Sequence, residues 1–111
     1  MRSTTLTICA TNYGPRVRLE LSRKAQKDLD DIRDFSVQHF GVDRTIAYLD
    51  TFEATFRRIL DFPEIGAPHF ELTPATRAIG CQRHRIYYEL TGATVVIVRI
   101  LHQAMDVARW I

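Results

Sequence analysis

Two stretches of helical periodicity separated by one glycine limit most strongly what this chain can fold into. Apolar residues recur every three or four positions in residues 25–40 and again in residues 46–60, with Gly41 between the two stretches. This spacing predicts two amphipathic helices, each about 30 Å long. Gly41 is placed to end the first helix, and Asp43 is placed to cap the second. Helices joined by two or three residues must fold back antiparallel, so we expect a helical hairpin.

Each predicted helix carries one apolar stripe for burial. Ser22 stands at the N-cap position of the first helix, and Pro63 should end the second at Phe62, because proline disfavours helical geometry in the residue before it. The expected stripe residues are Ala25, Leu29, Ile32, Phe35, Ser36 and Phe40 in the first helix, and Ile46, Leu49, Phe52, Phe56, Ile59 and Leu60 in the second.

The segments on either side of the hairpin predict strands. Residues 16–21 alternate charged and apolar side chains, which is the pattern of a half-buried strand. Residues 83–90 and 93–101 read as two strands joined by a tight turn at Thr91-Gly92, and residues 77–80 as a short strand. The proline-rich residues 63–76 predict an irregular connection, and the end of the chain predicts one or two helical turns.

This order of elements predicts an α+β fold of two layers. An N-terminal strand is followed by the antiparallel two-helix hairpin, which should pack on a mainly antiparallel sheet of three or four strands, with a short C-terminal helical turn. A length of 111 residues leaves room for one domain. We assign that domain to residues 15–111 and treat residues 1–14 as an N-terminal extension.

Charge is distributed unevenly along the chain. Residues 1–24 hold five basic residues and one acid, residues 25–76 five basic and ten acidic, and residues 77–111 five basic and two acidic. We therefore expect an acidic helical layer and a basic sheet layer. The net charge of only +2 does not favour direct sequence-specific DNA binding by this chain alone.

Several classes of function find no support in the motifs. The glycines form no phosphate-binding loop, and the four histidines and two cysteines lack metal-ligand spacing, so we expect no metal and no cofactor. No apolar run reaches the roughly 18 residues needed to span a bilayer, and we expect no membrane partner. The start of the chain lacks the features of a signal peptide, which together with two unpaired cysteines predicts a cytoplasmic protein.

The strand at residues 83–90 carries a basic and aromatic pattern. Its alternation puts Arg83, Arg85, Tyr87 and Glu89 on one face, with His84, Ile86, Tyr88 and Leu90 facing the core. The first face suits contact with RNA, DNA or an acidic protein segment. It equally suits a solvated face on which Glu89 pairs with Arg85 or Arg99. Trp110 suits either core packing, which we favour, or an exposed anchor for a partner.

The motifs LSRKAQKDLDDI, RHRIYYEL and ATVVIVRILHQAMDVARWI resemble the ParE/RelE superfamily of type II toxin–antitoxin toxins, over Val17 to Ile111. RelE-like members cut mRNA in the ribosome with basic side chains on the sheet and often a tyrosine near the end. Here the residues after the last strand are Gln103-Ala104-Met105, no basic residue follows until Arg109, and Trp110 stands where the tyrosine would be. The ending LHQAMD is similar to the ParE-like branch.

The ParE resemblance implies a toxin that is not an enzyme. It implies inhibition of DNA gyrase through stabilisation of its cleaved DNA complex, and neutralisation by a ParD-like antitoxin protein whose arm folds on the toxin. We expect gyrase to contact the sheet face and tail, at Arg85, Tyr87, His102, Met105, Asp106 and Trp110. Two alternatives stay open: a RelE-like ribosome-dependent mRNA endonuclease using Arg83, Arg85, Arg99 and Tyr87, and a degenerate member that only binds its antitoxin.

Overall fold

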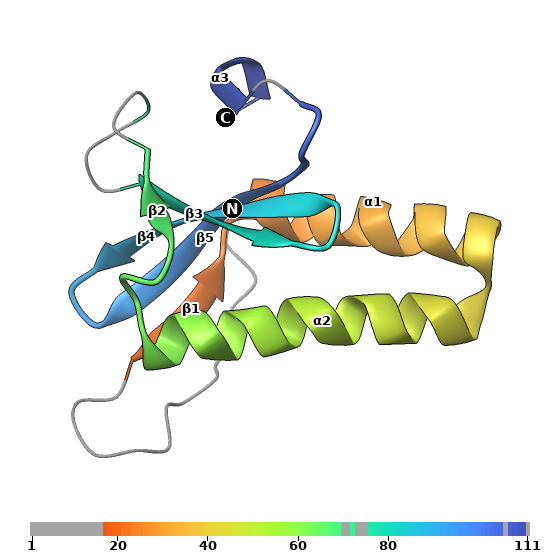
Figure 1. Cartoon of the computed structure of the whole chain (residues 1–111), viewed down its shortest axis with the longest axis horizontal. Coiled ribbons are helices and arrows are strands. Elements are labelled where there is room, and N and C mark those ends of the chain that lie inside the picture. The colour runs from red at the N-terminus through yellow and green to blue at the C-terminus, as the bar shows by residue number, and fades with distance from the viewer. Residues whose placement is uncertain (1–16, 70–71, 73–75, 106, 111) are drawn as a thin grey trace.

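The helical hairpin packs on one face of a five-stranded sheet (Figure 1). The computed structural model describes residues 17–69, 72, 76–105 and 107–110. The elements are β1 (Arg18–Leu21), α1 (Arg23–Phe40), α2 (Val42–Asp61), β2 (Ala67–Pro68), β3 (Thr76–Cys81), β4 (His84–Thr91), β5 (Thr94–His102) and α3 (Val107–Trp110). The α+β prediction is confirmed, and the predicted extension at residues 1–14 lies outside the described residues.

The sheet has the strand order β1-β5-β4-β3-β2. Strands β2 to β5 pair antiparallel in sequence order, whereas β1 pairs parallel with residues 94–97 of β5. The sheet has one strand more than the upper limit predicted, because Ala67 and Pro68 pair with β3. The prediction of a wholly irregular connection at residues 63–76 is therefore wrong at these two positions.

Local chemistry at the helix ends explains where the helices begin and stop. The Ser22 side chain accepts a hydrogen bond from the Ala25 N–H at 3.0 Å, which confirms it as the N-cap of α1. Gly41 ends α1 with φ +84° and also precedes the first residue of α2. The prediction of Asp43 as the second N-cap is wrong. Asp43 instead lies in the first turn of α2, where its negative carboxylate interacts favourably with the positive end of the helix dipole.

The main core lies between the hairpin and the sheet. It is built from Leu19, Leu21, Ala25, Ile32, Phe52, Phe56, Ile59, Leu60, Cys81, Ile86, Tyr88, Val95, Ile97 and Ile100. The Tyr88 phenol donates to the Pro63 carbonyl and accepts from the Gly66 N–H, both at 2.8 Å. A Cβ at Gly66 would lie 2.8 Å from the Tyr88 side chain, so only glycine fits there. The buried tyrosine thus fixes the start of the connection after α2.

The far half of the helical hairpin has no sheet to pack against. Both helices extend past the sheet towards Gly41 (Figure 1). Phe35, Phe40 and Ile46 are consequently 56%, 55% and 54% exposed, so the prediction that they join the core is wrong. The helical period itself is confirmed, but the sheet covers only the half of the stripe nearer to Ser22 and Asp61.

The faces of β4 differ from simple alternation in two places. Tyr87 is only 3% exposed, because it packs with Ala78 and Leu101 under Leu72 and Met105 on the face away from the helices. The prediction of Tyr87 as an exposed side chain is therefore wrong. Leu90 is exposed, contrary to prediction, because it lies at the end of the strand. The turn that follows is Gly92-Ala93, one residue later than predicted, with Gly92 at φ +60° as a type II′ turn requires.

Phe56 and Phe40 test the division between packed and overhanging halves of the hairpin. Phe56→Ala should lower the free energy of unfolding by about 3–5 kcal/mol, because it removes a fully buried ring. Phe40→Ala should change it by less than about 1 kcal/mol, since that ring is largely exposed. Urea denaturation followed by circular dichroism measures both values. Equal losses in the two variants would contradict this division.

Candidate functional site

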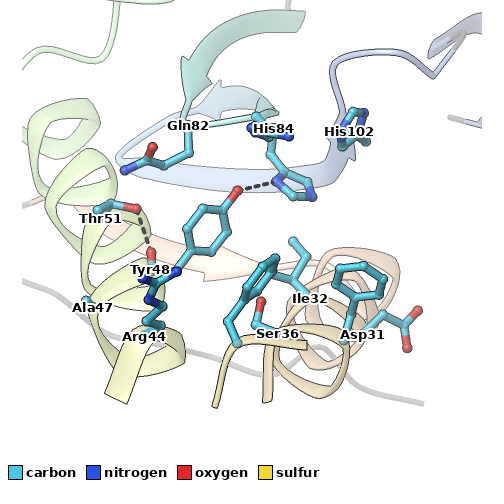
Figure 2. A pocket seen from close by; sticks show the side chains of 13 residues that line it. Asp31, Ile32, Ser36, Arg44, Ala47, Tyr48, Thr51, Gln82, His84 and His102 are labelled. Carbon is cyan, nitrogen blue, oxygen red and sulfur yellow. Dashed lines mark hydrogen bonds between the residues drawn. The ribbon is translucent and has the colours of Figure 1, made fainter. Parts of the chain in front are cut away.

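A groove runs between the overhanging half of the hairpin and one end of the sheet (Figure 2). Its volume is about 990 Å³. The helices contribute Asp31, Ile32, Phe35, Ser36, Phe40, Arg44, Ala47, Tyr48 and Thr51, and the sheet end contributes Gln82, Arg83, His84 and His102. The groove forms because both helices extend beyond the end of the sheet. No other part of the described chain covers the helix sides that line it.

A tight turn brings the sheet end of the groove together. Cys81 pairs with His84, so Gln82 and Arg83 form a two-residue turn between β3 and β4. Gln82 has φ +57°, a left-handed conformation that costs a non-glycine residue about 1–2 kcal/mol. His84 is also directly opposite His102 on β5, which places a second imidazole at the same end. The turn and the strand ends thus gather four polar side chains.

Tyr48 and His84 join the helical layer to the sheet. The Tyr48 hydroxyl and His84 Nδ1 lie 2.9 Å apart, and Figure 2 shows the phenol reaching from α2 to the imidazole. The rings of Tyr48 and Phe52 also meet the His84 ring edge-on. Burial raises the pKa of Tyr48, so the hydroxyl keeps its proton at neutral pH and can donate it to the imidazole.

The two histidines form a close pair with different partners. The ring centroids of His84 and His102 are 5.4 Å apart. Burial lowers the pKa of His84, and the nearby His102 lowers it further against the weaker opposing effect of Asp28. His102 is exposed, and its Nδ1 accepts the Ala104 N–H at 3.1 Å. His84 is therefore held in its neutral form at neutral pH.

Charge at the rim of the groove is mainly positive. Arg44 and Arg83 are exposed, and neither forms an ion pair with another described residue at salt-bridge distance. Asp31 is the carboxylate among the lining residues, and Lys27 pairs with it at 3.1 Å. Apolar walls with a basic rim fit an apolar ligand segment that carries negative charge.

Arg99 is largely buried because it pairs with a residue of α1. Its side chain is 12% exposed, and its Nε and Nη2 bind the two carboxylate oxygens of Asp28 at 2.9 and 2.8 Å. The hydrogen bonds that Arg99 donates to the Asp28 carboxylate raise the pKa of Arg99. The same guanidinium donates through Nη1 to the backbone carbonyl of Trp110. Arg99 is thus committed to α1 and α3, and the predicted pairing of Arg99 with Glu89 is wrong.

The residues predicted to contact a target fall into two places. His102 lies in the groove, whereas Arg85 is exposed on the sheet face away from the helices. Tyr87 is buried on that face, with Met105 packed over it. Trp110 is 50% exposed on α3, so the prediction of core packing is wrong. Asp106 lies outside the described residues.

Most of the groove residues carry no sequence signal of function. No motif marks Tyr48, Arg44 or Phe35 as functional, and strand alternation predicts His84 in the core, although it is only half-buried. The available signal is the excess length of the two helical stripes over the strands that they must cover.

The described residues contain no cluster of three or more potential metal ligands. None of their helices is both long and apolar enough to cross a bilayer.

Comparison with known proteins gives the family. The family model described as the ParE toxin of the type II toxin–antitoxin system parDE matches residues 19–107. The chain belongs to the ParE toxin family. Toxin ParE1 of Caulobacter vibrioides is 37% identical over 86 residues, covering 78% of this chain and 88% of the relative. Toxin ParE1 of Mycobacterium tuberculosis is 37% identical over 93 residues, covering 83% and 95%.

A solved structure supports the same fold. A chain of the chromosomal ParDE system from P. aeruginosa superposes with a TM-score of 0.67 at 22% identity, covering 78% of this chain and 95% of that chain. The family match and the two relatives confirm the resemblance to ParE toxins drawn from the sequence motifs. This ParE-family chain shares its two-layer architecture with that structure.

Asp28 and Asp31 offer a matched test of how the toxin is held together. Asp28→Ala should lower the free energy of unfolding by about 3 kcal/mol, because it leaves the largely buried Arg99 without its carboxylate. Asp31→Ala removes only an exposed pair with Lys27 and should cost less than about 1 kcal/mol. Chemical denaturation compares the two. A similar small loss in both would show that the Asp28–Arg99 pair contributes little.

His84 should make the stability of the toxin depend on pH. Because the folded protein lowers the pKa of His84, the unfolded chain binds more protons as the pH falls below about 6.5. His84 therefore contributes stability above that pH that is lost on acidification. His84→Asn keeps a polar atom near Tyr48 but cannot titrate. The free energy of unfolding of wild type minus that of the variant should fall between pH 7.5 and 5.5, and a constant difference would contradict the assignment.

Proposed function

We propose that this ParE-family toxin inhibits DNA gyrase by stabilising its cleaved DNA complex, and that a ParD-type antitoxin neutralises it in the cytoplasm. One observation argues against an mRNA endonuclease: the side chains of Arg99 and Tyr87 are not exposed on the sheet surface. Arg99 is bound to Asp28, and Tyr87 is 3% exposed. A metal-independent nuclease needs several charged groups converging on one phosphate, and Arg85 alone does not supply them.

The outer sheet face and the tail are the proposed gyrase-binding surface. Arg85 is an exposed cation there, and Trp110 offers a half-exposed ring on α3, which Arg99 anchors through the Trp110 carbonyl. Large aromatic and arginine side chains supply most of the binding energy at protein interfaces. Tyr87 supports this surface from below, with Met105 of the tail packed over it.

The groove is the proposed antitoxin site. Its walls include Phe35 and Phe40, and the neighbouring Val42 and Ile46 are more than half exposed. Exposed apolar side chains clustered on one surface indicate a partner that covers them. A disordered antitoxin arm that folds into an amphipathic segment on binding would bury this surface, and acidic residues in the arm would meet Arg44 and Arg83.

A gyrase cleavage assay tests the proposal. Purified toxin mixed with gyrase and supercoiled plasmid should yield trapped, cleaved DNA that requires gyrase. Trp110→Ala should weaken this activity by about tenfold or more, as expected for loss of an aromatic anchor. Phe40→Ala is the matched control, because it truncates an exposed aromatic residue in the groove and should leave gyrase cleavage unchanged.

Antitoxin binding should respond to the same two variants in the opposite way. Phe40→Ala should weaken binding of the antitoxin by about tenfold, while Trp110→Ala should leave it near the wild-type value. Folded toxin that traps no cleaved DNA but cuts ribosome-bound mRNA would favour the endonuclease alternative. Harmless expression of the toxin without antitoxin would favour a member that only binds its antitoxin.

A further inference from the structure

We propose that the sheet end of the groove binds a carboxylate of the antitoxin arm, held by His84, His102 and Arg83, and that a proton is taken up with it. This inference rests on the proposed antitoxin site and adds the chemistry that recognises the arm. Three observations support it: the hydrogen bonds that fix the two imidazoles, the charges around them, and the closeness of the rings.

Nδ1 of each imidazole is engaged as an acceptor, so the neutral ring has its Nε2–H left as a donor. The Ala104 backbone N–H can only donate, so Nδ1 of His102 is unprotonated and the neutral ring carries its hydrogen on Nε2. Burial raises the pKa of Tyr48, so its hydroxyl keeps a proton that it can donate to Nδ1 of His84, 2.9 Å away. In that arrangement the hydrogen of the His84 ring also lies on Nε2. Two N–H donors at one end of a groove fit an acceptor with two oxygens, which is the character of a carboxylate.

The surrounding charges also favour an anion. Arg83 lies in the turn next to His84, and Arg44 lies on α2 across the groove. On α1, Asp31 is paired with Lys27, and Asp28 is occupied by Arg99 and the Ile100 N–H. The negative charges of α1 are therefore already satisfied, whereas the two arginines have no such partner among the described residues. An Asp or Glu side chain of an otherwise apolar arm matches this arrangement.

Binding a carboxylate here should be coupled to protonation. In the free toxin, burial and the neighbouring imidazole keep His84 neutral. A docked carboxylate places a negative charge beside the His84 ring, which favours its imidazolium form. The other groups that face the pair are Tyr48, Arg44, Arg83, Asp28 and Asp31. Imidazole is the side chain that ordinarily changes charge between pH 6 and 8, so affinity for the arm should rise as the pH falls.

Isothermal titration calorimetry with a full-length ParD-type antitoxin that neutralises the toxin tests this inference. The dissociation constant should fall by about tenfold from pH 8 to pH 6. Titrations in two buffers with different ionisation enthalpies should show uptake of close to one proton. His102→Gln keeps an N–H donor near the position of Nε2 and removes the imidazole that lowers the pKa of His84. It should bind nearly as tightly as wild type at pH 8 and keep the gain at pH 6, because the proton is taken up by His84.

Two further variants complete the test. His84→Asn should lose most of the gain in affinity at pH 6, and its thermal melting curve shows whether it is folded. His69→Gln changes a histidine that contacts Tyr87 on the other face of the sheet and should retain the full pH dependence. Tight antitoxin binding with neither pH dependence nor proton uptake would overturn the carboxylate site and leave the proposed function intact. Binding that is unaffected by Phe40→Ala would instead overturn the groove as the antitoxin site.

Discussion

The junction at Asp28 is the interaction on which the arrangement of the three parts of this toxin depends. Strand β1 pairs with β5 only as far as Ile97, so the edge of β5 beyond it needs other partners. Ser22 donates its backbone N–H to the Ile97 carbonyl and its hydroxyl to the Val98 carbonyl. Asp28 accepts hydrogen bonds from the Ile100 N–H and from the Arg99 guanidinium. Because Arg99 also holds the Trp110 carbonyl, one carboxylate from α1 fixes the helical layer, the sheet edge and the tail.

In the proposed function, this junction separates the gyrase-binding surface from the antitoxin site. Arg99 is used to hold α3, which carries Trp110 on the side of the sheet away from α2 (Figure 1). On the other side the helices overhang the sheet and form the groove. A toxin with separate target and antitoxin surfaces can be neutralised by an arm that never touches the target surface, provided the arm blocks access to gyrase or reshapes the toxin.

Particular residues show how far local sequence rules reach. Ser22 and Gly41 were correctly placed as helix ends, because caps depend on a few neighbouring atoms. The period of three and four correctly predicted both helices, yet it assigned Phe35, Phe40 and Ile46 to the core. Tyr87 shows the reverse error, since strand alternation cannot foresee that the tail folds over that face. The groove was not predictable because Tyr48 and His84 are 36 residues apart and meet only across the two layers.

The element types, the antiparallel hairpin, the α+β class and the resemblance to ParE toxins follow from the amino-acid sequence alone, because they depend on periodicity, caps and contiguous motifs. Tertiary packing is needed to establish which part of each stripe is covered, where Arg99 finds its counterion, and which imidazoles meet. Those outcomes depend on relative lengths and on contacts such as Asp28 with Arg99, 71 residues apart in the chain. Local propensity constrains neither the relative lengths of the elements nor such long-range contacts, whereas the packing of one helical layer on one sheet determines both.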